Sequence, residues 1–210
     1  MKLTNDWFYF ISALDKDACK KIKDAGIKKL KEATVDLNKG ELSKGQREKG
    51  RAPVYGSNKK ARQSQVAWLQ EKWIYDLIFP YMWEANKRAG WNFEITSCET
   101  PQLTQYKKNN YYGWHIDGGS DSLSKFTSSN PLLNGKVRKI SMTLLLNEDY
   151  KGGDFQIGRF EEEKANISTP EFNKAGSIIF FPSFLNHQVV PITNGIRYSL
   201  VAWFLGPPFK

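Results

Sequence analysis

The chain has 210 residues and a net charge of +9, with 40% hydrophobic and 25% charged residues, a composition typical of a globular protein with one sizeable core. No apolar run approaches the ~20 residues of a membrane span, and the first residues lack the apolar stretch of a signal peptide. Two cysteines exclude a disulfide framework or a cysteine-based zinc site, so a cytoplasmic protein without a membrane partner is expected.

The N-terminal part of the chain has the spacing of helices. Apolar residues three to four positions apart predict a first helix that runs to about Ala33, and Asp15 or Asp17 can cap it. A second helical region is expected over residues 61–89. It should break near Pro80, because proline has no N–H for the helical hydrogen bond.

Much of the excess positive charge lies before residue 90, in the helical N-terminal part, residues 1–92. The charge permits nucleic acid or an acidic protein as a partner, but lysines on the wet faces of helices account for it as well. Between the two helical regions, residues 38–58 are rich in Gly, Lys and Ser and predict a loop.

From residue 93 onward, short runs of β-branched and aromatic residues alternate with turn residues. Many short strands in this space favour a sandwich or jelly roll over alternating β/α units. The serine-rich segment 118–134 is too long for an idle connector, so a lid is expected there. The predicted strands are Leu103–Lys107, Tyr111–Ile116, Lys139–Leu146, Asp154–Ile157, Ser177–Phe181, Gln188–Ile192 and Arg197–Leu205.

The chain has two histidines, and one of them stands two positions before an aspartate. On a strand, His115 and Asp117 would point to the same face, and His187 follows at the start of a later strand. Two imidazoles and one carboxylate form the facial triad of non-haem iron(II) oxygenases, which leaves three positions for a bidentate cosubstrate and O₂. The same ligands would also suit a hydrolytic zinc site, and the pattern alone leaves both open.

A basic residue follows the second histidine at a useful distance. A strand pair that runs out from His187 and returns through a turn at residues 193–195 would bring Arg197 back towards the metal. Its guanidinium can bind a carboxylate bidentately, and Ser199 on the same strand face can add a hydrogen bond. Because the segment is apolar, an inward Arg197 needs an anionic partner.

Taken in order, these motifs resemble the 2-oxoglutarate- and iron(II)-dependent dioxygenases of the prolyl 4-hydroxylase type. The resemblance covers roughly residues 95–206, and the order of its motifs is more specific than any one of them. The motifs are Tyr106, Tyr112, His115-x-Asp117, the run from Arg138 through KISMTLLLN, Gly152-Gly153, AGSIIFFPSFLNH ending at His187, and Arg197 followed by Ser199.

The resemblance implies a mainly β fold with N-terminal helices, built on a double-stranded β-helix core of the jelly-roll, cupin-like kind. One domain over residues 1–210 is expected, with this core in 93–210. The ligand triad of histidines and aspartate matches the iron(II) site, and Arg197 matches the residue that binds the distal carboxylate of 2-oxoglutarate. Tyr106 matches a tyrosine of the cosubstrate pocket.

Three further residues are expected at the substrate. Arg138 and Trp203 match substrate-contacting positions of the prolyl branch, and Tyr112 is expected either to line the substrate or to be structural. One departure from the pattern is Leu145, because several prolyl hydroxylases have a tyrosine there. If that tyrosine helps to hold 2-oxoglutarate, Ser199 or Tyr106 must supply the hydroxyl instead.

The implied activity is hydroxylation of a C–H bond, foremost on a prolyl residue of a peptide or protein, using O₂ and 2-oxoglutarate and releasing succinate and CO₂. Ascorbate is a further candidate cofactor. A lysyl residue, a small molecule or a nucleic-acid base remains an alternative substrate. A nucleic-acid base is disfavoured as the substrate. Nucleic-acid demethylases resemble the patterns His-x-Asp-x-Glu and Arg-x5-Arg, and this chain has Gly119 in place of the Glu and Trp203 in place of the second Arg. A metal-free jelly-roll binding protein is the non-enzymatic alternative, and the oligomeric state is not readable.

Overall fold

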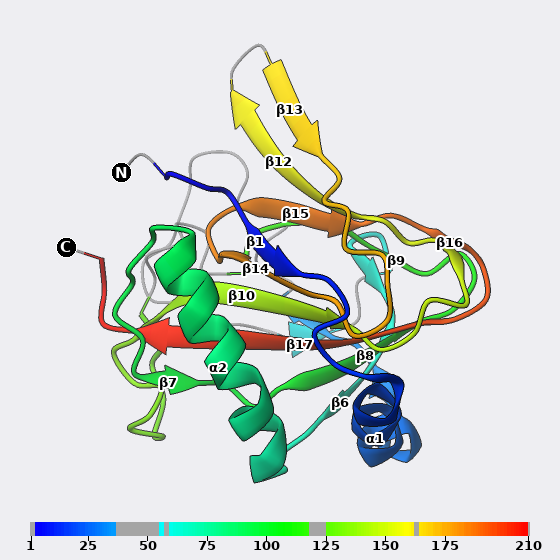
Figure 1. Cartoon of the computed structure of the whole chain (residues 1–210), viewed down its shortest axis with the longest axis horizontal. Helices are drawn as coiled ribbons and strands as arrows, with labels where there is room; N and C mark the ends of the chain where they lie inside the picture. The colour runs from blue at the N-terminus through cyan, green and yellow to red at the C-terminus, as the bar shows by residue number, and fades with distance from the viewer. Residues whose placement is uncertain (1–2, 37–54, 57–58, 118–124, 162–163, 210) are drawn as a thin grey trace.

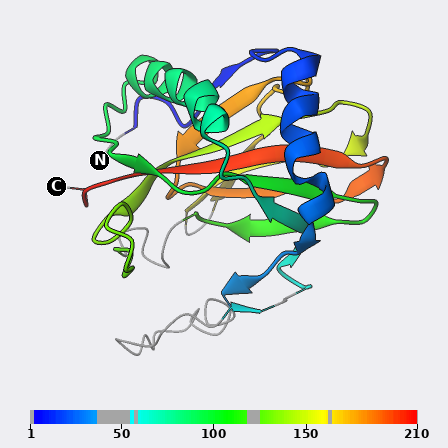
Figure 2. The same ribbon diagram turned by 90° about the horizontal axis from the view of Figure 1, so that it is seen from below.

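Two antiparallel β-sheets face each other, and two helices lie against the outer side of the larger sheet (Figure 1; Figure 2). Within the part of the chain that the structure describes, the fold is mainly β with helices in the N-terminal part, as the sequence predicts. This computed structural model describes residues 3–36, 55–56, 59–117, 125–161 and 164–209.

The larger sheet has eight strands among the described residues, and β10 and β17 form its centre. These two strands pair antiparallel over most of their length, with Leu145 opposite Ser199 at one end. The strands in sheet order are β1 (Phe8–Phe10), β14 (Ile178–Pro182), β10 (Val137–Leu145), β17 (Arg197–Gly206), β8 (Gln102–Tyr106), β6 (Gln65–Trp68) and β2 (Lys31–Glu32), while β7 (Ser97–Cys98) pairs with β17.

The smaller sheet has five strands in the described ranges, and β15 is its central strand. Two-stranded ribbons complete the β structure: β11 (Lys151–Gly152) with β16 (Ile192–Asn194), and β3 (Val35–Asp36) with β4 (Tyr55–Gly56). The strands of the smaller sheet in order are β13 (Lys164–Ser168), β12 (Phe155–Glu161), β15 (Asn186–Val189), β9 (Tyr111–His115) and β5 (Arg62–Gln63).

The main hydrophobic core lies between the helices and the outer face of the larger sheet. Ile22 of α1 (Lys16–Gly26) and Ile78 of α2 (Lys72–Arg88) are fully buried there against Met142 of the sheet. Because strand side chains alternate, Arg197, Ser199 and Trp203 of β17 face the opposite way, into the space between the two sheets. That inner space therefore receives the polar residues of the predicted site.

The first helix begins where the sequence predicts. The Asp15 side chain accepts a hydrogen bond of 2.7 Å from the backbone N–H of Ala18, which is a standard N-cap. The predicted end at Ala33 is wrong, because α1 ends at Gly26 and a short 3₁₀ helix, η1 (Ile27–Lys29), follows. The next residues instead pair as β2 with β6 and extend the sheet.

The predicted second helix is wrong in its first third. Residues 62–68 form β5 and β6, and the helix α2 begins only at Lys72. Each of these short strands pairs with a strand far away in the chain: β5 with β9, and β6 with β8. Pairing of this kind is a tertiary interaction that local apolar spacing does not reveal.

The predicted break at Pro80 is also wrong, because α2 continues through that residue. Pro80 lies on the exposed side of the helix, where water can bond the carbonyl that loses its N–H partner. On the other side, Ile74, Ile78 and Met82 are fully buried. Packing of this face stabilises the helix on both sides of the proline.

All seven predicted strands are present, with shifted ends. The expected strand Gln188–Ile192 divides into β15 and β16 around Pro191, since proline cannot donate a ladder hydrogen bond. The predicted turn is present, with Gly195 at a φ of +75°. However, β15 and β17 are not a strand pair, because they belong to different sheets and the chain crosses between the sheets here.

Two predicted loops lie partly outside the described residues. Most of 38–58 is undescribed, and so is 118–124 of the predicted lid. Within 125–134, the backbone of Phe126 is hydrogen bonded to Lys136 and Gly135, which closes a compact turn beside β10. The lid therefore stays a prediction.

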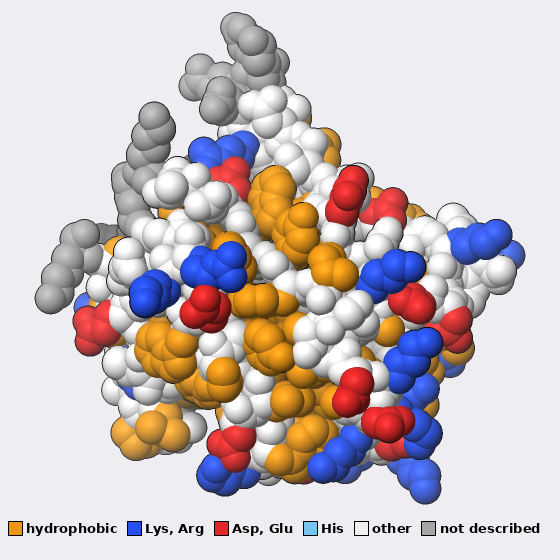
Figure 3. Space-filling view, viewed as in Figure 1, with side chains coloured by type: hydrophobic (Ala, Val, Ile, Leu, Met, Phe, Trp, Pro, Cys, Tyr) orange, Lys and Arg blue, Asp and Glu red, His pale blue; other side chains and the backbone are white. Residues whose placement is uncertain are grey.

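The lysines of α1 lie on its solvent-facing side, as expected for a wet helix face. Lys16, Lys20 and Lys21 are exposed, and Figure 3 shows basic and acidic side chains together over this part of the surface. Lys20 forms an exposed ion pair with Asp24 at 2.5 Å. Neither helix in the described part of the chain is long and apolar enough to cross a bilayer.

Candidate metal centre and cosubstrate pocket

His115, Asp117 and His187 converge at one end of the smaller sheet. His115 ends β9, and it lies directly opposite His187 of the neighbouring strand β15. Asp117 follows β9, and its backbone N–H donates to the Ser183 carbonyl at 2.9 Å. One ligand atom of each of the three side chains lies within 4.8 Å of the others, so the group could hold a metal ion.

The orientation of both imidazoles leaves the same nitrogen facing the centre. Nδ1 of His115 lies 2.8 Å from the Gly113 carbonyl, and Nδ1 of His187 lies 3.0 Å from the Leu185 carbonyl. A carbonyl can only accept, so each Nδ1 is assigned as the N–H donor and each Nε2 keeps a free lone pair. The Nε2 atoms lie 3.6 and 3.4 Å from the Asp117 carboxylate.

The electrostatics of the cluster suit a cation. Burial, followed by the charge of His187, lowers the pKa of His115 well below its ordinary value, so the ring is neutral. Burial works against ionisation of Asp117, yet its electrostatic interaction with the histidines, foremost with His187, outweighs burial and lowers the pKa of Asp117. Neutral imidazole beside an ionised carboxylate is the donor set that binds a divalent metal.

Arg197 lies between the sheets, and only 1% of its surface is exposed. Its Nη1 donates to the Ser199 hydroxyl at 3.0 Å, and its guanidinium carbon lies 5.6 Å from the ring centre of Tyr106, the residue opposite it on β8. Its Nε has no hydrogen-bond partner among the described residues. The structure therefore brings together Arg197, Ser199 and Tyr106 as the sequence predicts, around a buried donor that lacks an acceptor.

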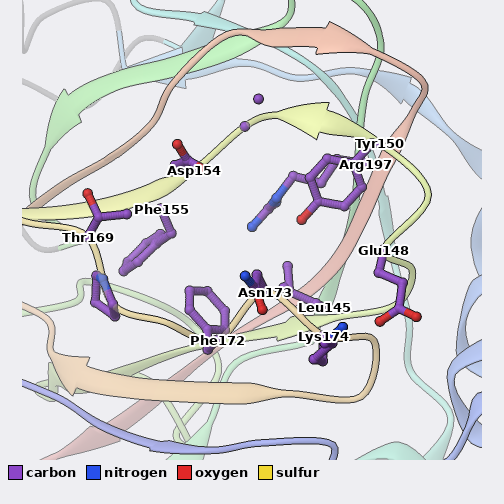
Figure 4. A pocket seen from close by; sticks show the side chains of 13 residues that line it. Leu145, Glu148, Tyr150, Asp154, Phe155, Thr169, Phe172, Asn173, Lys174 and Arg197 are labelled. Carbon is purple, nitrogen blue, oxygen red and sulfur yellow. The ribbon is translucent and has the colours of Figure 1, made fainter.

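Arg197 points into a cavity of about 500 Å³, whose wall it shares with Phe155 and Phe172 (Figure 4). The ring of Phe155 lies 5.7 Å from the ring of His187, so this residue borders both the cavity and the metal-binding group. The other lining residues are Leu145, Glu148, Tyr150, Gly152, Gly153, Asp154, Thr169, Pro170, Asn173 and Lys174.

Leu145 lines this cavity at the position where a tyrosine was expected from related sequences. It brings no hydroxyl, so the bond to the guanidinium comes from Ser199. Gly153, at a φ of +70°, lies against the same arginine. A Cβ there would come within 2.2 Å of Ile192 and 3.1 Å of the Arg197 side chain, so the glycine makes room for both.

Arg138 lies in a cluster beside the metal-binding group, and its charge reaches Asp117. Its guanidinium binds the Glu99 carboxylate with two hydrogen bonds, of 2.5 and 2.7 Å, and lies 4.3 Å from the ring centre of Trp203. Burial opposes the charge on Arg138, but Glu99 outweighs burial and raises its pKa. Glu99 is a residue of this cluster that sequence reasoning missed.

Tyr112 has both faces of its ring in contact with other side chains. The imidazole of His115 stacks on one face, with ring centres 3.5 Å apart and planes 15° from parallel. The guanidinium of Arg62 lies 4.5 Å from the ring centre, and since His115 covers one face it must lie against the other. Burial raises the pKa of Tyr112 to about 12. Only the edge and hydroxyl of this ring are left for a substrate.

The fold and the site define a jelly-roll protein with a two-histidine, one-carboxylate metal-binding group, the arrangement of non-haem iron(II) oxygenases. The sequence model of the 2OG-Fe(II) oxygenase superfamily matches residues 101–205, half of the chain. The chain belongs to this family.

Curated relatives match the same half of the chain. A PKHD-type hydroxylase of Xylella fastidiosa strain M12 is 35% identical over 106 residues, which cover 49% of this chain and 43% of that protein. The PKHD-type hydroxylase YbiX of Escherichia coli is 32% identical over 111 residues, with 51% and 43% covered. The matched segment thus spans less than half the length of these relatives.

Solved structures share the fold over nearly the whole chain. A prolyl hydroxylase of Trichoplax adhaerens, in complex with a peptide fragment of a hypoxia inducible factor, has a TM-score of 0.65 at 18% identity, covering 96% of this chain and 84% of that one. A Pseudomonas putida prolyl-4-hydroxylase has a TM-score of 0.59 at 17% identity, covering 96% and 92%. At this identity the likeness shows the jelly-roll fold alone.

Proposed function

We propose that the chain is an iron(II)- and 2-oxoglutarate-dependent dioxygenase that hydroxylates a prolyl residue of a peptide or protein. The observation that carries this proposal is the pairing of two features. One is a two-histidine, one-carboxylate group, and the other is a buried arginine, at the cavity beside it, that lacks an acceptor for its Nε among the described residues. A metal ion and a dicarboxylate together satisfy both.

In this proposal His115, Asp117 and His187 hold iron(II). The donor set fits the metal, because both Nε2 lone pairs and one ionised carboxylate face a common centre. The carbonyls bonded to the two Nδ1 atoms keep each ring in the tautomer that a metal ligand needs. Three protein ligands leave the remaining positions for the cosubstrate and O₂.

Arg197 binds the distal carboxylate of 2-oxoglutarate. Its Nε is a buried donor without a partner among the described residues, and such a donor costs about 1–3 kcal/mol unless a ligand supplies the acceptor. Ser199 accepts from the same guanidinium and can orient it, and Tyr106 supports it from the neighbouring strand. Leu145 leaves the hydroxyl role to Ser199.

When bound, iron(II) and 2-oxoglutarate supply the oxidation, in which one oxygen atom of O₂ enters the substrate C–H bond and the other leaves in succinate, with release of CO₂. The protein residues bind and orient these groups and exclude water around them. Phe155 and Phe181 pack against the His187 ring and keep the inner side of the centre apolar.

The prolyl substrate is supported by the relatives and by the cluster beside the centre. Relatives carry the name PKHD-type hydroxylase, and the Trichoplax prolyl hydroxylase is in complex with a peptide fragment of a hypoxia inducible factor. Arg138 and Trp203 stack next to the metal-binding group, with Glu99 fixing the guanidinium. This arrangement can present an aromatic surface and a cation to an extended peptide.

The test uses purified full-length chain with iron(II), ascorbate and 2-oxoglutarate. We expect succinate formation, and we expect proline-containing peptides to gain the mass of one oxygen atom drawn from isotopically labelled O₂. Lysine peptides and proline-free peptides are the matched substrates, and the His187→Ala variant is the enzyme control. Absence of both succinate formation and metal binding would refute the dioxygenase, while succinate formation with oxygen gain only on other substrates would refute the prolyl assignment.

A further inference from the structure

Arg62 lies in the segment that was expected to be helical, and its strand brings it to the metal-binding group. The strand β5 pairs with β9, with Arg62 opposite Tyr112. Two hydrogen bonds fix its guanidinium: Nε donates to Ser64 at 2.7 Å and Nη2 donates to Gln102 at 3.0 Å. Gln102 is a buried residue of the larger sheet, so Arg62 ties the edge of the smaller sheet to the larger one.

A three-layer stack connects this arginine to the first histidine. The guanidinium of Arg62 lies against Tyr112, and Tyr112 stacks in parallel on the imidazole of His115. A planar cation on an aromatic face contributes roughly 0.5–2 kcal/mol, depending on how far it is desolvated. Because the guanidinium is itself held at two points, it restrains the tyrosine, and the tyrosine restrains the imidazole.

The backbone beside Arg62 makes a second connection to the same imidazole. The Gly113 N–H donates to the Ala61 carbonyl at 2.9 Å, and the Gly113 carbonyl accepts from Nδ1 of His115 at 2.8 Å. The step from Ala61 to Arg62 thus holds the His115 ring at its Nδ1 edge and on one of its faces. His187 has no such support from β5, since β12 and β9 flank its strand.

We propose that Arg62 is a positioning residue of the metal centre, which acts through Tyr112 to hold the His115 imidazole in the orientation that binds the metal. The inference rests on the proposed metal site. It predicts an effect opposite in sign to that of simple electrostatics. A positive charge near a cation repels it, so loss of Arg62 would strengthen metal binding if charge alone mattered. If Arg62 positions the imidazole, its loss weakens metal binding instead.

The test measures the dissociation constant of Co(II) for the full-length chain by calorimetry, together with the visible spectrum of the bound ion. We expect Arg62→Met to weaken Co(II) binding about 10-fold, the lower end of the effect of contacts behind a metal ligand. Tyr112→Leu should weaken binding similarly, Tyr112→Phe should not, and Arg62→Met should add little in the Tyr112→Leu background. Arg62→Lys, which keeps the charge and loses the plane, should resemble Arg62→Met.

The matched control is Arg88→Met, which removes a guanidinium from the face of Phe8, at 4.8 Å, on the helix side of the larger sheet. We expect Co(II) affinity of the wild type in this variant. Unchanged or tighter Co(II) binding in Arg62→Met would overturn the inference and leave the metal site intact. If Arg62→Met does not fold, the Co(II) affinities of Tyr112→Leu and Arg62→Lys are compared instead. Similar weakening in both supports the inference, and wild-type affinity in Arg62→Lys overturns it. Wild-type protein that binds no Co(II) would overturn the proposed function together with the inference.

Discussion

The two histidines of the site stand on neighbouring strands and are held in different ways. His187 is on the central strand of the smaller sheet, its side chain is only 6% exposed, and Phe155 and Phe181 pack against its ring. His115 ends β9, its side chain is 17% exposed, and only the two-residue strand β5 lies beyond it. The central ligand is fixed by burial, whereas the outer ligand depends on a stack of side chains.

Two ligands of the same residue type can therefore differ in how strongly their orientation depends on individual neighbouring residues. A residue packed on all sides needs no special partner, because its neighbours leave one orientation. A residue near a sheet edge has open space beside it, so specific contacts must supply the restraint. Substitutions of the two histidines and of the residues around them separate these two kinds of support.

The largest effect is expected from removing a histidine. His187→Ala and His115→Ala should both abolish metal binding, because each removes one of three protein ligands. The metal-free proteins should differ, however. We expect His187→Ala to lower the free energy of unfolding by about 2–3 kcal/mol and His115→Ala by about 1 kcal/mol, according to their burial. Urea unfolding in the presence of a chelator measures the free energy of unfolding of both variants. Equal decreases would contradict the difference in support between the two histidines.

A second prediction separates the smaller sheet, which carries the proposed metal ligands, from the larger sheet, which carries Arg197. Arg197→Ala should weaken 2-oxoglutarate binding about 10- to 100-fold, since hydrogen bonds to charged groups contribute about 1.5–3 kcal/mol. Metal affinity without 2-oxoglutarate should remain that of the wild type. Titration of the metal-loaded protein with 2-oxoglutarate measures the cosubstrate affinity, and calorimetry without 2-oxoglutarate measures the metal affinity. Arg197→Lys, which keeps the charge, should retain part of the affinity, and an unchanged cosubstrate affinity in Arg197→Ala would place the binding site elsewhere.

The smallest effect on the metal is expected from the cluster beside the centre. Glu99→Gln leaves the half-buried Arg138 with a neutral partner, so the free energy of unfolding should fall by about 1–2 kcal/mol. Co(II) affinity should stay within about twofold, because no ligand loses a contact. Thermal unfolding and calorimetry provide the two readouts. A large loss of Co(II) affinity would show that this cluster also supports the ligands, which would remove the contrast with Arg62.

The strands and the ligand triad could be predicted because their signals are local. Alternating apolar residues in β10 and β17 predict strands whatever they pair with, and His115 with Asp117 forms a short motif in a chain that has two histidines. Arg197 could be predicted as well, since an inward cation in an apolar strand requires an anion. The prediction that β15 and β17 pair was wrong, because two sheets can receive consecutive strands.

The short strands of the N-terminal part could not be predicted. β5 has two residues, and a strand of that length forms only because β9 lies beside it. Arg62 therefore fell inside the predicted helical region 61–89. Glu99 was missed for a similar reason, because its partner Arg138 lies far along the chain.

By itself the sequence determined the class of fold, and it predicted three residues for a metal site and an arginine for a cosubstrate pocket, since each depends on residue types at short spacing. Only the tertiary structure decided how the two histidines are supported and that both faces of Tyr112 are covered. It also decided that Arg138 is paired with Glu99. These contacts join strands that are distant in sequence, so their energy depends on a geometry that exists only once both sheets have formed.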